Sequence, residues 1–237
     1  MNLAKSLNDI SLYMMAIVFL LSAGLSVIQS RQKDGTEKTL KVLMASNWFF
    51  FGISYVILVS RLYISFDQAA LHITLYRILL IADVIALASI FLYIALKYAN
   101  KLPKFSIAMK IFGLLQVLGL TILVIFDPGF SIKQTSLYVE IVPSFSCQTG
   151  ISLSMVILIL SLLVTAGLLE RKNTTLEKSE KIAERKDVLL LALFIFLMIV
   201  HIPLPLIVGY QLMGSLTIFV FRVLISTTVL SHIFVTK

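Results

Sequence analysis

Long apolar segments recur along the chain, separated by short polar connections. The hydrocarbon core of a bilayer is about 30 Å thick, so a helix needs about 20 mainly apolar residues to cross it. Seven windows reach this length, over residues 10–30, 42–66, 73–98, 105–126, 150–169, 188–210 and 215–234. The pattern predicts an all-α polytopic membrane protein, a seven-helix transmembrane bundle in which residues 1–237 form a single domain.

Composition agrees with this interpretation. Hydrophobic residues make up 59% of the chain and charged residues 14%, and the mean hydropathy is +1.00. These values lie outside the range of an ordinary soluble domain. The first window is longer than the core of a signal peptide, and Asp9 interrupts the basic region that such a peptide carries, so we expect this segment to remain as the first helix.

Basic residues are concentrated on alternate connections. The first, third and fifth connections and the C-terminus hold Arg31, Lys33, Lys38, Lys41, Lys97, Lys101, Lys104, Lys110, Arg171, Lys172, Lys178, Lys181, Arg185, Lys186 and Lys237. The positive-inside rule therefore predicts a multi-pass protein with its N-terminus outside and its C-terminus in the cytoplasm. The net charge of +8 describes this cytoplasmic face, which favours the lipid bilayer with its anionic headgroups as a partner and no nucleic acid.

Ionisable residues inside the predicted spans are the first candidates for a functional site, because burying them in a membrane is unfavourable. Helical rise places Asp83 about 15 Å and Arg222 about 10 Å below the outer ends of their helices. An ion pair between them would neutralise both groups. His201 lies in the outer half of the sixth window, just before Pro203 and Pro205, which are expected to kink that helix.

Arg61 and Arg77 are predicted near the outer surface. We expect Arg77, Asp83, His201 and Arg222 to border an outward-facing polar cavity that binds a small polar or anionic ligand. Structural alternatives remain for each residue. The two outer arginines could simply extend to the membrane interface, His201 could be a buried hydrogen-bonding group, and Asp83 with Arg222 could lock two helices together.

Two connections carry local signals. Asp127-Pro128-Gly129 is a turn sequence, and residues 137–142 are rich in strand formers, so this outer loop is predicted either to form an extended lid or to lie along the membrane surface. In the fifth connection, Thr174 and Glu177 have the spacing of a capping box, which predicts a cytoplasmic helical extension of the sixth helix.

Catalysis is not supported by the motifs. The chain has no HExxH zinc motif, no GxSxG nucleophile elbow and no pair of carboxylates inside the membrane, so we expect no enzyme activity. The three histidines, His72, His201 and His232, lie on different segments without ligand spacing, and Cys147 is the only cysteine. We therefore expect no metal site and no cofactor. The last window also lacks the lysine that a microbial rhodopsin uses to bind retinal.

Three segments carry a resemblance to a known family. They are Asn47-Trp48-Phe49-Phe50-Phe51-Gly52-Ile53-Ser54-Tyr55, Tyr76-Arg77-Ile78 and Phe91-Leu92-Tyr93-Ile94-Ala95-Leu96-Lys97-Tyr98. This pattern resembles the seven-transmembrane sensor region found at the N-terminus of many prokaryotic histidine kinases. The resemblance implies a sensory input module in a prokaryotic plasma membrane. The chain departs from the family because no coiled coil, dimerisation histidine box or ATP-binding domain precedes Lys237, so we expect the signal to leave through the cytoplasmic loops or a separate partner.

The sequence thus predicts a stand-alone membrane sensor or receptor-like module. A small-solute transporter is the alternative from another class, although the break at Pro203 and Pro205 has no counterpart in the second or third helix, as an inverted repeat would require. A structural subunit of a membrane complex is the third interpretation.

Overall fold

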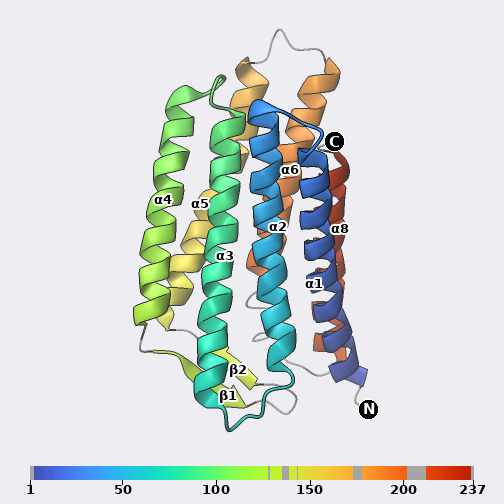
Figure 1. The fold of residues 1–237 in the computed structure, drawn as a ribbon, viewed down its shortest axis with the longest axis vertical. Coiled ribbons are helices and arrows are strands. Elements are labelled where there is room, and N and C mark those ends of the chain that lie inside the picture. Colours follow the sequence, from blue (N-terminus) through green and yellow to red (C-terminus); the bar gives the residue numbers. More distant parts are fainter. Residues whose placement is uncertain are drawn as a thin grey trace.

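The computed structural model describes residues 3–127, 129–134, 139–142, 144–172, 178–201 and 212–235. Within these residues the chain forms seven long helices (Figure 1). They are α1 (Leu3–Ser30), α2 (Gly35–Arg61), α3 (Ala69–Lys97), α4 (Pro103–Phe126), α5 (Phe145–Lys172), α6 (Lys178–His201) and α8 (Leu212–Val235). The predicted seven-helix bundle is confirmed.

Six of the described helices, all except α6, are long and apolar enough to cross a membrane. The described part of α6 begins with a charged segment that includes Glu184, Arg185, Lys186 and Asp187. Outward faces of the bundle are apolar; α4, for example, exposes Ile107, Ile111, Leu114, Leu118 and Ile122. Aliphatic side chains of this kind suit contact with lipid acyl chains, and the chain is a multi-pass membrane protein.

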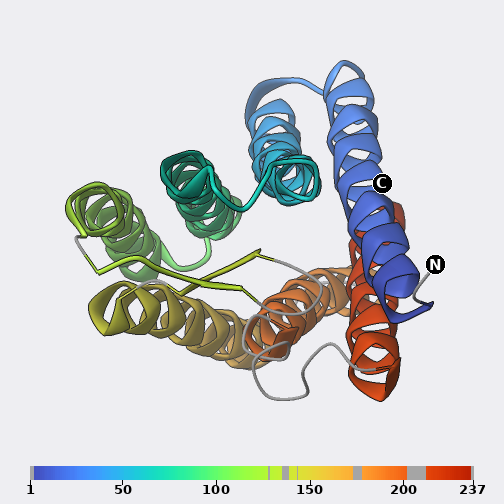
Figure 2. The same ribbon diagram turned by 90° about the horizontal axis from the view of Figure 1, so that it is seen from below.

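The helices form a closed ring. Each packs against its neighbours in the order α1, α2, α3, α4, α5, α6, α8, and α8 returns to α1 (Figure 2). The most buried of the candidate spans is α3, which also contacts α5. An aromatic cluster fills the core between α1, α2 and α6, where the rings of Phe19, Trp48 and Phe51 each lie within about 6 Å of the Phe194 ring.

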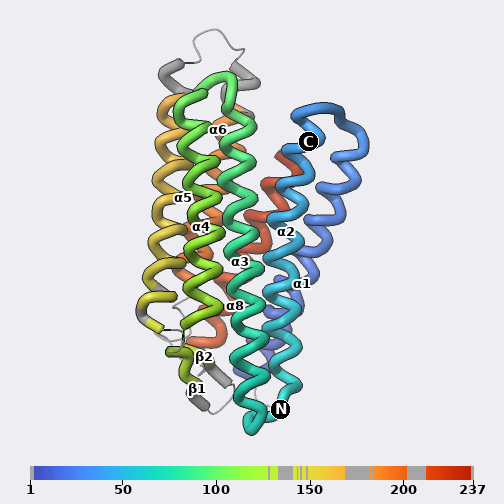
Figure 3. The backbone as a smooth tube through the Cα atoms, turned by 60° about the vertical axis from the view of Figure 1, so that its left-hand side comes forward, coloured from blue at the N-terminus to red at the C-terminus, as the bar shows by residue number. Residues whose placement is uncertain are grey.

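The two ends of the bundle differ. One end, here called the basic end, holds the α1–α2 and α3–α4 connections, the end of α5, the start of α6 and the end of α8 (Figure 1, Figure 3). The opposite end, here called the hairpin end, holds the start of α1 and two short strands. The connections that the sequence marks as basic therefore lie together.

The hairpin end carries the only strands of the described residues, β1 (Ser131–Gln134) and β2 (Val139–Val142). They pair antiparallel, with Ser131 opposite Val142 and Gln134 opposite Val139. The strand formers predicted within residues 137–142 do form a strand over the described residues 139–142. Residues 137 and 138 lie outside the described residues.

Helix boundaries differ from the apolar windows in two important places. The first helix, α1, begins at Leu3 and not at residue 10. The second helix is α2, residues 35–61, and not 42–66, because the chain turns at Leu62–Ile64 through hydrogen bonds to carbonyls three residues back. Tyr63 and Phe66 are exposed apolar residues of the following connection. Hydropathy cannot separate an apolar interfacial turn from a helix. The sixth helix begins at Lys178, as its predicted extension requires. Thr174, Glu177, Pro203 and Pro205 lie outside the described residues.

Candidate functional site

A buried polar cluster lies at the hairpin-end side of the bundle. Arg222 of α8 donates through Nε to His201 Nε2 of α6 at 3.0 Å. Its Nη1 donates to the Asn8 backbone oxygen at 3.0 Å, to Asn8 Oδ1 at 2.7 Å and to Ser11 Oγ of α1 at 2.7 Å. All four side chains are buried. We call Asn8, Ser11, His201 and Arg222 the Arg222 cluster; it joins α1, α6 and α8.

Asp83 lies elsewhere. Its partner is the Ser54 hydroxyl of α2, and the predicted ion pair with Arg222 is not formed in this structure. The reason is the ring order: Asp83 of α3 faces α2, whereas Arg222 of α8 faces α1 and α6. Both groups interact electrostatically with the buried Tyr55 of α2. The structure therefore brings together two of the four predicted ligand-binding residues, His201 and Arg222.

Arg77 holds the hairpin connection. Its Nη2 donates to the Asp127 backbone oxygen at 2.7 Å, and its guanidinium lies 5.2 Å from the centroid of the Phe130 ring. The Asp127 carboxylate in turn accepts the Gly129 N–H at 2.8 Å and the Ser144 N–H at 3.2 Å, which closes the base of the hairpin. Arg61, the other predicted outer arginine, lies over the Tyr76 ring at 5.3 Å.

The pKa of Asp127 is lower than its usual value. Burial acts to raise it, but hydrogen bonds from Gly129 and Ser144, together with the charge of Arg77, favour the carboxylate and prevail. A lowered pKa means that this group stabilises the fold above the carboxyl's ordinary pKa of about 3.9 and that the contribution is lost as the pH falls below it. The base of the hairpin is therefore held most firmly at neutral pH.

Replacing Arg77 with glutamine is expected to loosen the hairpin without unfolding the bundle. The change removes the bond to Asp127 and the contact with Phe130, together worth about 1–2 kcal/mol locally. Hydrogen–deuterium exchange should show faster exchange of the amides in β1 and β2. Arg31→Gln, at the exposed α1–α2 connection of the other end, is the matched control. Equal protection of the strands in both variants would contradict the anchoring role.

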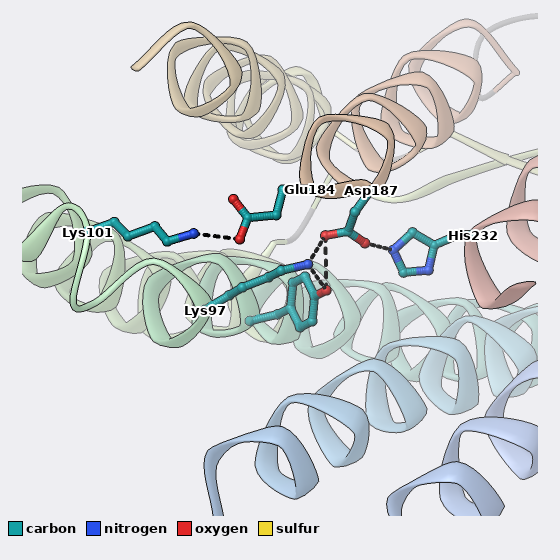
Figure 4. Close-up of polar contacts among 6 residues, drawn as sticks. Lys97, Lys101, Glu184, Asp187 and His232 are labelled. Atoms are coloured by element: carbon teal, nitrogen blue, oxygen red, sulfur yellow. Dashed lines mark hydrogen bonds and ion pairs between the residues drawn. The ribbon is translucent and has the colours of Figure 1, made fainter. Parts of the chain in front are cut away.

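A second buried polar cluster lies at the basic end (Figure 4). Asp187 of α6 is the centre. One of its oxygens, Oδ2, lies 2.5 Å from Lys97 Nζ and accepts the Tyr93 hydroxyl at 3.0 Å, both from α3. The other, Oδ1, lies 2.8 Å from His232 Nε2 of α8. We call Tyr93, Lys97, Asp187 and His232 the Asp187 cluster; it joins α3, α6 and α8.

A second ion pair continues from this cluster towards solvent. Lys101 Nζ lies 2.6 Å from Glu184 Oε1, one helical turn further out on the α6 side (Figure 4). Exposed fractions rise in the same direction: the Asp187 side chain is 2% exposed, whereas that of Glu184 is 25% and that of Lys101 is 34% exposed. The two pairs connect α6 to the end of α3 and to the connection that follows it.

Two helices, α6 and α8, take part in both clusters. His201 and Asp187 lie on α6, and Arg222 and His232 lie on α8. Along α8 the two clusters are separated by about 15 Å of helical rise. Between them both helices bury apolar residues, including Phe194, Ile195, Ile225 and Val229. A mainly apolar layer thus separates two polar layers that share the same pair of helices.

The Asp187 cluster and the α1 members of the Arg222 cluster are absent from the sequence-based site. Lys97 and Asp187 were interpretable only as loop charges, because each lies at the boundary of an apolar window. The sequence did contain one signal for this cluster: Lys97 and Asp187 carry opposite charges and lie at a similar distance from the same end of the predicted bundle. Asn8 precedes the first apolar window, and only the structure shows that α1 begins at Leu3 and places Asn8 and Ser11 on one helix face.

The chemistry of these clusters is ion pairing and hydrogen bonding. In the described part of the chain no group of three or more His, Cys, Asp and Glu side chains could hold a metal ion. Cys147, the one cysteine, is buried. No protein-family model, curated protein or solved structure matches this chain.

Proposed function

We propose that this protein is a membrane sensor or receptor-like module that binds a small polar or anionic ligand from the hairpin end and signals at the basic end. The observation that carries the proposal is the pair of helices, α6 and α8, that connects the two buried polar clusters. The resemblance of residues 47–55 and 91–98 to sensor regions of prokaryotic histidine kinases supports the same class of function.

The proposal includes an orientation, with the hairpin end outside the cell and the basic end in the cytoplasm of a plasma membrane protein. Its support is the gathering of the basic connections at one end (Figure 1). A reporter that is active only in the cytoplasm, fused after Lys237, is expected to be active. An expressed but inactive fusion would contradict this orientation.

Ligand binding is proposed at the Arg222 cluster. A guanidinium donates in a planar, forked geometry that matches carboxylate and phosphate oxygens. A ligand with such a group would replace one or more of the bonds that Arg222 makes with Asn8 and Ser11 of α1. Asp83 and Arg77 would contribute from α3, Asp83 through the electrostatics it shares with Arg222 at Tyr55 and Arg77 through the hairpin that it holds.

The signal would pass from the ligand site to the basic end through a change in the position of α8. Packed helix interfaces tend to occupy discrete arrangements, and a ligand shifts the population between two of them by as much as its affinities differ. When Arg222 exchanges α1 for the ligand, α8 is released from one of its two neighbouring helices in the cluster. The far end of α8 carries His232, so the Asp187 cluster would respond, and the neighbouring connections would present the change to a partner protein.

A two-stage experiment tests this function. First, small anionic and polar metabolites are screened for thermal stabilisation of the protein in lipid nanodiscs. A ligand of the proposed site stabilises the native protein and Arg31→Gln, and loses its effect in Arg222→Gln. If no compound does so, or if the effect survives in Arg222→Gln, the ligand site is refuted.

Second, the ligand's effect at the basic end is measured as the distance between two spin labels. The labels are attached to cysteines introduced by Asn100→Cys and Phe234→Cys, because Asn100 and Phe234 are exposed at the basic end. Cys147→Ala removes the natural cysteine, so that only these two positions are labelled. Binding is expected to change the distance distribution between the labels. An unchanged distribution would contradict transmission, and uptake of the ligand into sealed proteoliposomes would favour a transporter instead.

A further inference from the structure

Asp83 is a carboxylate in the middle of a candidate membrane span, and the ion pairs among the described side chains all involve other carboxylates. Its contact is with the Ser54 hydroxyl of α2. That hydroxyl also lies within hydrogen-bond distance of the backbone oxygens of Phe50 and Leu79, at 3.1 and 3.2 Å. Because a serine hydroxyl has a single hydrogen, these acceptors compete for it. Asp83 therefore has acceptor capacity left for another donor.

The accessible surface of Asp83 lies inside the bundle. Leu71, Ile78 and Leu92 are exposed and share one side of α3, which marks its lipid face. Asp83 follows Ile78 by five positions, or about 140° around the helix, so it points away from the lipid. It is nevertheless partly exposed, whereas Leu80 on the same interior side is buried. A small polar group can thus approach the carboxylate from within the bundle.

Arg222 is the nearest opposite charge in electrostatic terms, and a tyrosine links the two. In the ring, α2 lies between α3 and α1, and α1 packs against α8 (Figure 2). Tyr55 of α2 is buried, and its ring stacks on Phe19 of α1 with the centroids 5.5 Å apart. Asp83 and Arg222 both act electrostatically on Tyr55. Two opposite charges thus share one neighbour without forming an ion pair with each other.

These charges decide which ligand fits the Arg222 cluster. An anion that replaces Asn8 or Ser11 at the guanidinium also comes close to the carboxylate of Asp83, and like charges repel strongly in an interior of low dielectric constant. A cation at Asp83 is repelled in the same way by Arg222. A ligand with both an ammonium and a carboxylate satisfies both residues and adds no net charge to the membrane interior.

We infer that the ligand is a small zwitterion of the amino-acid type, bound with its carboxylate at Arg222 and its ammonium at Asp83. This inference rests on the function proposed above and narrows its class of ligand. The guanidinium supplies forked donors to the carboxylate, and Asp83 with the Ser54 oxygen supplies acceptors to the ammonium. Binding thereby connects α8 to α3 and α2, two helices outside the Arg222 cluster.

The native protein tests the class of ligand directly. Thermal stabilisation in lipid nanodiscs is measured with three matched sets of probes. The first set is the common amino acids with β-alanine and γ-aminobutyrate, the second is carboxylates without the ammonium, such as acetate, propionate and butyrate, and the third is the corresponding alkylamines. At least one amino acid should bind about tenfold to a hundredfold more tightly than its carboxylate and amine relatives, because each relative lacks one contact to a charged group. Carboxylates that bind as tightly as the amino acids, or no binding by any amino acid, would overturn the inference without any variant.

Asp83→Asn should change the selectivity of the site, which a purely structural role would not do. The variant loses the partner of the ammonium and the repulsion of anions together. The preferred amino acid should therefore bind at least about tenfold more weakly, while its carboxylate relative binds as well as before or more tightly. Asp34→Asn, which removes an exposed carboxylate at the basic end, is the matched control and should keep the native preference. A folded Asp83→Asn that keeps the native preference refutes the inference, and if this variant does not fold, the three sets of probes on the native protein decide.

The results also separate this inference from the function on which it rests. An anion that stabilises the native protein, loses its effect in Arg222→Gln and binds equally well to Asp83→Asn leaves the ligand site in place and refutes the zwitterion. If neither these probes nor the wider screen of metabolites yields a ligand that depends on Arg222, both are refuted.

Discussion

Replacing Asp187 with asparagine is expected to lower the free energy of unfolding by about 3–5 kcal/mol. The carboxylate is buried and contacts three partners, Tyr93, Lys97 and His232, on two other helices. Without its negative charge, Lys97 remains as a largely buried cation whose closest counter-ion is gone. Unfolding of both proteins in mixed micelles, followed by circular dichroism, measures the difference.

Two variants test the cause of that loss. Asp34→Asn is the matched control, because it removes a carboxylate from an exposed position at the same end of the bundle, and it should change stability by less than about 0.5 kcal/mol. The double variant Asp187→Leu with Lys97→Met removes both charges and should recover much of the loss. A double variant no better than Asp187→Asn would show that the ion pair is not the source of the effect.

Arg222→Gln is expected to lower the free energy of unfolding by about 3 kcal/mol, because several hydrogen bonds to a buried charged group are lost at once. Double-mutant cycles then identify its partners. With Asn8→Ala the coupling should be about 1–2 kcal/mol, since the change removes Asn8 Oδ1, to which Arg222 donates at 2.7 Å, and keeps the backbone oxygen of residue 8. With Asp83→Asn the two effects should add to within about 0.5 kcal/mol, because the side chains do not meet.

The two cycles separate the structure from the simpler interpretation of the sequence. Strong coupling of Arg222 to Asp83, with none to Asn8, would restore the ion pair inferred from helical depth. The arrangement of α8 against α1 and α6 would then be wrong at this level of the bundle. In the same unfolding measurements, Arg77→Gln should lower the free energy of unfolding by less than Arg222→Gln does, because the contacts of Arg77 lie in the hairpin.

For the candidate site, the sequence provides the depth of each residue below the end of its helix. Counting residues placed Asp83 and Arg222 at similar distances from one end, and this was enough to propose a pair. Pairing also depends on the rotation of each helix about its axis and on which helices are neighbours. Apolar windows contain neither, since α3 has apolar residues on nearly every face and gives no marked amphipathic direction.

The sequence by itself determined the seven-helix bundle, the gathering of the basic connections at one end and the strand at residues 139–142. These follow from rules that act locally: a chain in lipid must satisfy its own backbone, which makes long apolar segments helical, and successive spans alternate their ends. Only the tertiary structure decided that Arg222 meets Asn8, Ser11 and His201, and that Asp187 meets Lys97 and His232. Those contacts join helices far apart in the chain, and they depend on packing that brings particular faces together at one depth.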